Sequence, residues 1–87
     1  MSPNRHRMCR EGLPRHTRSL LNLAMLSALG RWHEFGVHVR GALNNGVTPA
    51  EIAEVLLQAG VYAGIPVAAE GMRRAKAVVS AHAAAAP

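Results

Sequence analysis

The sequence has little cysteine and few aromatic residues, and each shortage excludes a class of protein. Cys9 is the single cysteine among 87 residues, which excludes an internal disulfide, dithiol redox chemistry and a cysteine-based metal cage. Only Trp32, Phe35 and Tyr62 are aromatic, although 49% of the residues are hydrophobic. The core must therefore be built from Ala, Leu, Val and Ile, a mixture that favours small-residue helix packing over a sheet. A chain of this length forms one domain.

The chain also lacks an apolar run of the roughly 18 to 20 residues that are needed to cross a bilayer. Its amino terminus is rich in Arg and His, and no hydrophobic stretch of the signal-peptide type follows it. We therefore expect a cytoplasmic protein without a membrane partner.

Positive charge is unevenly distributed along the chain, which has a net charge of +5. Residues 1–18 contain five arginines and one glutamate, a net +4, whereas residues 19–87 contain five basic and four acidic residues, a net +1. We interpret residues 1–12 as a basic, disordered arm and residues 13–87 as the folded domain. Such an arm can bind polyanions in a salt-sensitive way. Because no aromatic residues are interleaved with the charges, we do not expect nucleic acid as a partner.

The remaining sequence predicts an all-α domain of four antiparallel helices joined by very short turns. The helices are expected over residues 15–29, 31–45, 49 to about 64, and from 66 onward. The third has the strongest start signal, because Thr48 can cap it, Pro49 suits its first position and Glu51 can complete a capping box. Its apolar face repeats at helical spacing through Ile52, Val55, Leu56 and Ala59. Four short helices with this much apolar surface exceed what one copy can bury, so we expect self-association.

Ionisable residues concentrate on the second predicted helix, where they fall into two groups. At 100° per residue, Arg31, Glu34 and His38 share one stripe, and His33 and Arg40 lie on the opposite side. The core face between them is formed by Trp32, Phe35, Val39 and Ala42. Glu34 lies four residues before His38, so it can orient the imidazole as a general acid and base. The alternative is an ion-pair ladder on a wet surface, which contributes little to either stability or chemistry.

Metal and nucleophile chemistry are poorly supported by the same spacing. His33 and His38 are five residues apart and point about 140° away from each other, whereas a helical zinc site needs histidines four apart. We therefore expect no metal. No serine lies in a Gly-x-Ser-x-Gly elbow, which argues against a serine nucleophile. On the third helix, Glu54, Gln58 and Tyr62 share a face that suits a subunit contact or a pocket wall.

Several motifs together resemble the carboxymuconolactone decarboxylase family. They are Arg18-Ser19-Leu20, Gly30-Arg31-Trp32-His33-Glu34, His38 with Arg40, Asn45-Gly46-Val47-Thr48, Glu51-Ile52, and Gln58 followed by Tyr62-x-Gly64-x-Pro66. The resemblance covers residues 12 to about 79. It implies an all-α, alkyl hydroperoxidase D-like domain that assembles into a homo-oligomer, a hexamer or a trimer, with active sites near subunit contacts.

The resemblance is strongest to the 4-carboxymuconolactone decarboxylases of aromatic-compound catabolism. It implies cofactor-free conversion of 4-carboxymuconolactone to 3-oxoadipate enol-lactone in the protocatechuate and 3-oxoadipate pathway, with a small lactone carboxylate as substrate. His38, Glu34 and His33 are the catalytic candidates, and Arg31 and Arg40 are the substrate-binding candidates. The hydroperoxidase branch has cysteines where Arg31 and Glu34 stand here, so we do not expect thiol peroxidase activity.

One departure from the family pattern leaves two alternatives open. Decarboxylases of this type carry a further helical stretch before the Gly12-Leu13 segment, and here residues 1–12 replace it. Part of a pocket wall is then expected to be missing. The alternatives are a non-catalytic oligomeric binding or scaffold protein of the same fold, and a family member that acts on another substrate.

Overall fold

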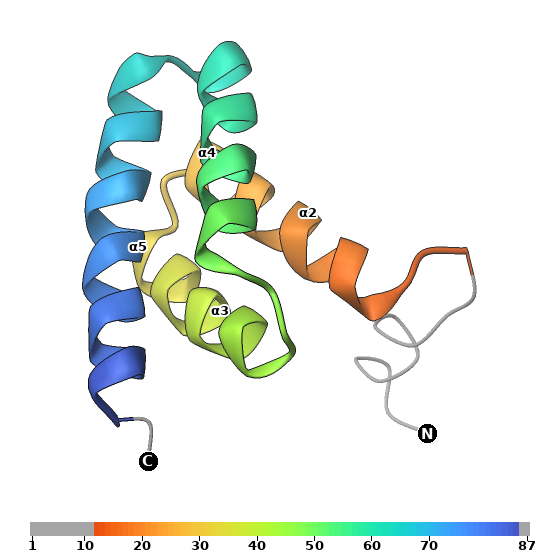
Figure 1. The fold of residues 1–87 in the computed structure, drawn as a ribbon. Helices are drawn as coiled ribbons and strands as arrows, with labels where there is room; N and C mark the ends of the chain where they lie inside the picture. Colours follow the sequence, from red (N-terminus) through yellow and green to blue (C-terminus); the bar gives the residue numbers. More distant parts are fainter. Residues whose placement is uncertain (1–11, 86–87) are drawn as a thin grey trace.

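The computed structural model describes residues 12–85 and consists of four helices (Figure 1). They are α2 (Arg15–Ala28), α3 (Trp32–Asn44), α4 (Pro49–Ala63) and α5 (Ile65–Ala85). Residues 12–85 contain no strand, so the predicted all-α class is confirmed, and the predicted helix ends differ from the observed ones by at most about one residue. The predicted arm at residues 1–12 lies, apart from Gly12, outside the described residues. No described helix is long and apolar enough to cross a membrane.

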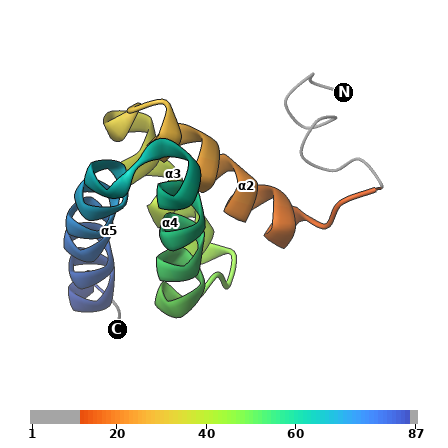
Figure 2. The same ribbon diagram turned by 90° about the horizontal axis from the view of Figure 1, so that it is seen from above.

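The start of α4 has the predicted capping box. The Thr48 hydroxyl accepts the backbone N–H of Glu51 at 3.1 Å, and the Glu51 carboxylate accepts the backbone N–H of Thr48 at 2.9 Å. At the other end, Gly64 alone separates α4 from α5 and has a φ of 107°, a value that side-chain-bearing residues rarely adopt. The chain therefore reverses within one residue, and α4 and α5 lie side by side (Figures 1 and 2).

The main helix contacts join α2 to α3 and α4, and α5 to α3 and α4, and α2 also touches α5 over a smaller area. In Figure 2, α4 and α5 stand next to each other, and α2 extends away from them toward the amino terminus. The core at the centre of this arrangement draws on all four helices and on the turn before α4. It consists of Leu23, Phe35, Val39, Ala42, Val47, Ile52, Leu56 and Ala75. The predicted core face of α3 is confirmed, with Trp32 only half-buried.

Glycine allows α4 and α5 to approach closely at one point. A Cβ atom added to Gly60 would lie 2.7 Å from the Cβ of Ala68. Carbon atoms in contact prefer about 3.5 to 4.0 Å, so only glycine fits at this crossing.

Large apolar side chains remain exposed on the outer face of α2 and around the end of α4. Their exposed fractions run from 45% for Leu21 to 87% for Tyr62. The set consists of Leu21, Met25, Leu29, Leu57, Val61, Tyr62 and Ile65. Together with the buried cluster, this agrees with the excess of apolar surface expected from the sequence.

Candidate functional site

The first turn of α3 carries three of the predicted site residues, Arg31, His33 and Glu34. Arg31 is the residue that precedes the helix, and its carbonyl accepts the backbone N–H of Phe35 at 2.8 Å. No side chain caps this end of the helix. Its position instead depends on Trp32, whose ring stands edge-on against Phe35 with 5.3 Å between centroids. Phe35 is fully buried, so Trp32 ties the first turn of α3 to the core.

Arg31, Glu34 and His38 all point away from the core and are exposed to solvent. A guanidinium nitrogen of Arg31 lies 3.9 Å from the Glu34 carboxylate. Within residues 12–85, neither a hydrogen bond nor an ion pair joins Glu34 to His38. The Glu34 carboxylate is therefore paired with Arg31, and it would have to turn toward His38 in order to orient the imidazole.

The stripe of Arg31, Glu34 and His38 lies on the side of α3 that faces away from α5. The opposite side is identified by Gly36, where an added Cβ would lie 3.9 Å from the side chain of Val78 on α5. His38 follows Gly36 by two residues, which is about 200° around the helix. This side is open in the single chain and available to a small molecule or to another polypeptide.

His33 and Arg40 are exposed on the other flank of the same helix. They lie about 140 to 160° around the helix from His38, so the body of α3 separates the two groups. A small ligand that touches His38 cannot touch His33 or Arg40 of the same chain. The five predicted residues therefore fall into two groups on different sides of α3.

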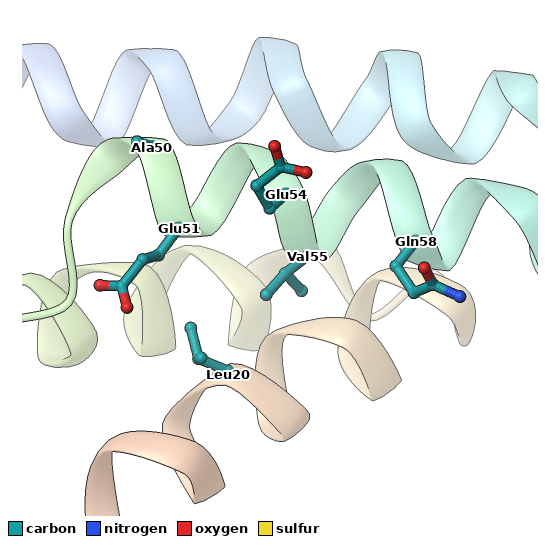
Figure 3. Close-up of a pocket in the computed structure, with 6 residues that line it drawn as sticks. All are labelled: Leu20, Ala50, Glu51, Glu54, Val55 and Gln58. Carbon is teal, nitrogen blue, oxygen red and sulfur yellow. The ribbon is translucent and has the colours of Figure 1, made fainter.

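A groove between α2 and α4 forms a further candidate site that the sequence did not predict as a whole. It has a volume of about 380 Å³ and is lined by Leu20, Ala50, Glu51, Glu54, Val55 and Gln58. Figure 3 shows Leu20, from α2, opposite the side chains of Glu51 and Val55 from α4. Glu54 and Gln58 were expected to share a face, and both line this groove. The contribution of Leu20 was not predicted, because it comes from a helix some 30 residues earlier in the chain.

Glu51, at one end of the groove, is occupied by structural contacts. One of its carboxylate oxygens lies 2.7 Å from Nε2 of His16 on α2, and the other accepts the Thr48 backbone N–H. The hydrogen bond from the Thr48 backbone, followed by that from His16, lowers the pKa of Glu51 below its ordinary value. His16 was missed by sequence reasoning, because nothing in the local pattern connects residues 35 positions apart. Glu54 is the groove carboxylate without a hydrogen bond to residues 12–85.

Metal ligands do not converge in the described part of the chain. Residues 12–85 contain no group of three His, Cys, Asp or Glu side chains close enough to hold an ion.

Comparison with known proteins places this helical arrangement in a family. The model of the carboxymuconolactone decarboxylase family matches residues 4–77, and the chain belongs to this family. The matched range begins eight residues before residue 12, where the sequence resemblance was expected to start.

Two characterised relatives share about half of their aligned residues with the chain. The chain is 49% identical over 69 residues to 4-carboxymuconolactone decarboxylase of Acinetobacter baylyi, and these residues make up 79% of this chain and 52% of that protein. The chain is 51% identical over 63 residues to nitrosuccinic acid decarboxylase of Metarhizium robertsii, and these residues make up 72% of this chain and 44% of that protein. The chain thus spans about half the length of the relatives it matches.

Proposed function

We propose that this protein is a decarboxylase, a carbon–carbon lyase, with 4-carboxymuconolactone as the leading substrate. Two relatives near 50% identity are both named as decarboxylases, which supports the reaction class. The observation that carries the proposal is the accessible stripe of Arg31, Glu34 and His38 on α3. It combines a fixed cation, a carboxylate and an imidazole outside the core, the side chains that such a reaction needs.

The substrates in the two names share one chemical feature. In 4-carboxymuconolactone, the electrons released with CO₂ can run through the conjugated double bond to the lactone carbonyl and form a dienolate. In nitrosuccinic acid, the carboxylate beside the nitro group can release CO₂ and leave a nitronate. In both cases one C–C bond breaks, one CO₂ leaves, and one proton is added to carbon. The substrate holds its own electron sink, so neither reaction needs a cofactor to accept electrons.

The residues of α3 fit these two steps. Arg31 is well placed to bind a substrate carboxylate before and during the reaction, because a guanidinium pairs strongly with carboxylates. His38, on the same side of the helix, delivers the proton. When the substrate carboxylate replaces the Glu34 carboxylate beside Arg31, Glu34 turns to the imidazole of His38. His33 and Arg40 belong to the other flank and serve a site formed with a neighbouring copy.

We propose that such a neighbouring copy is present and that the chain forms a homo-oligomer, either a trimer or a hexamer. A stable interface buries about 800 Å² from each partner. The seven large apolar side chains on α2, α4 and α5, which are 45 to 87% exposed, provide apolar surface for such an interface. Assembly also solves the geometrical problem of α3, since the His33 and Arg40 flank of one copy can then face the His38 stripe of the next.

Turnover of 4-carboxymuconolactone, generated in situ, tests the reaction, and nitrosuccinate serves as a second substrate in a parallel assay. The wild-type chain should form enol-lactone, and His38→Ala should lower kcat by about 10²- to 10⁴-fold, the usual contribution of a general acid. Glu34→Gln should lower it by less. His82→Ala is the matched control, because within residues 12–85 the His82 ring hydrogen-bonds to Asn44 alone, at 3.1 Å and away from the stripe.

Size-exclusion chromatography with light scattering gives the oligomer mass of each variant in the same experiment. An enzyme loses turnover in His38→Ala while its oligomer stays intact. A folded wild-type oligomer that turns over neither substrate would contradict the proposal and favour the scaffold alternative, in which His38→Ala and Glu34→Gln change stability alone.

A further inference from the structure

Arg74 of α5 lies over the ring of Trp32, the single tryptophan of the chain. The guanidinium carbon is 5.5 Å from the ring centroid, within the range of a cation–π contact. Nε of Arg74 donates to the Glu70 carboxylate at 2.5 Å, and Arg73 donates to the same carboxylate. These hydrogen bonds, from Arg73 first and then from Arg74, lower the pKa of Glu70. Glu70 therefore holds the Arg74 side chain in place above the ring.

In the sequence, Trp32 lies between Arg31 and Glu34. The proposed function assigns Arg31 to substrate binding and Glu34 to orienting the imidazole. The ring of Trp32 contacts Phe35 in the core, and Arg74 lies over it. The first turn of α3 has no side-chain cap, and its first helical hydrogen bond runs from the Phe35 N–H to the Arg31 carbonyl. Trp32 is therefore the side chain through which α5 can fix this turn.

We propose that Glu70 and Arg74 are positioning residues, which hold the first turn of α3 through Trp32 and so place Arg31 for the substrate carboxylate. Neither residue touches substrate. This inference rests on the proposed function for its catalytic consequence, whereas its structural part can be measured without any substrate.

Arg73 provides a matched control, because Arg73 and Arg74 both pair with Glu70 and only Arg74 covers Trp32. The experiment compares Arg74→Met and Arg73→Met with the wild-type chain. Each substitution removes one ion pair with Glu70 and keeps a long, flexible side chain. Arg74→Lys keeps the charge and should restore part of the contact.

Two readouts separate positioning from general stability. Hydrogen exchange at the Phe35 amide reports opening of the first turn of α3, and it should be about two- to fivefold faster in Arg74→Met, the effect expected of one cation–π contact. With 4-carboxymuconolactone, KM should rise by a similar factor while kcat changes by less than twofold, because Arg31 binds the carboxylate before and during the reaction. Arg73→Met should leave both quantities within twofold of the wild type, and Trp32 fluorescence should change only in the Arg74 variants.

Faster exchange and a higher KM in Arg74→Met alone would support the inference. Equal effects of Arg74→Met and Arg73→Met would overturn it, because the Glu70 pairs would then merely stabilise α5. If the wild-type chain turns over no substrate, the proposed function fails. Hydrogen exchange at the Phe35 amide then tests the positioning of the first turn by itself. The exchange must be faster in Arg74→Met and not in Arg73→Met.

Discussion

Gly60 and Gly36 are both helical glycines that face α5, yet replacing them by alanine should change stability in opposite directions. In an open position, Gly→Ala stabilises a helix by about 0.5 to 1 kcal/mol, since alanine loses less backbone entropy on folding. At Gly36 the new Cβ would lie 3.9 Å from Val78, an ordinary van der Waals contact. Gly36→Ala should therefore stabilise the fold by that amount.

At Gly60 the same change meets a rigid obstacle. The added Cβ would lie 2.7 Å from the Cβ of Ala68, about 1 Å closer than carbon atoms normally pack. The methyl group of Ala68 has no rotamer by which to move, so α4 and α5 must separate. Overpacking of this kind costs about 1 to 3 kcal/mol. After the gain in helix propensity, we expect Gly60→Ala to destabilise the fold by about 1 to 2 kcal/mol.

Urea denaturation monitored by circular dichroism, at one fixed protein concentration, measures both changes. Concentration must be held constant because assembly would add to the apparent stability. In thermal unfolding, the expected loss for Gly60→Ala corresponds to a Tm lower by about 5 to 15 °C in a domain of this size. A Gly60→Ala variant as stable as Gly36→Ala would refute the close α4–α5 crossing described above.

Two further predictions concern the start of α4. Thr48→Ala removes the acceptor for the Glu51 N–H and should lower the unfolding free energy by about 1 kcal/mol, whereas Thr48→Ser should retain it; urea denaturation at pH 7 compares the two. The folded-state pKa of Glu51 is lowered, so its contribution to stability is present above its ordinary pKa of 4.5 and is lost as the pH falls through the folded value. Glu51→Gln should flatten this part of the stability curve between pH 7 and pH 3, and equal curves for Glu51→Gln and the wild type would contradict the assignment.

The sequence predicted the local structure because local signals carry most of the information about these helices. Thr48, Pro49 and Glu51 define where α4 begins, and the structure contains the capping box they predicted. Apolar spacing on residues 32–42 gave the buried face of α3. The same spacing assigned Arg31, Glu34 and His38 to one side of that helix, which is where the structure has them.

Contacts between helices could not be predicted, because they join residues that are distant in the chain. The pairing of His16 with Glu51, the groove between Leu20 and α4, and the stacking of Arg74 on Trp32 all depend on how the helices pack. Periodicity gives the direction of a side chain around its own helix and carries no information about which helix it meets.

The candidate site shows both contributions within a few residues. By itself, the sequence determined the four helices, the cap of α4 and the faces on which the ionisable residues of α3 lie, since each follows from spacing along one segment. Only the tertiary structure decided that Glu70 and Arg74 reach α3 through Trp32, and that His16 of α2 pairs with Glu51 at one end of the groove. These outcomes depend on distances of a few ångströms between side chains, which are set by packing of the whole fold.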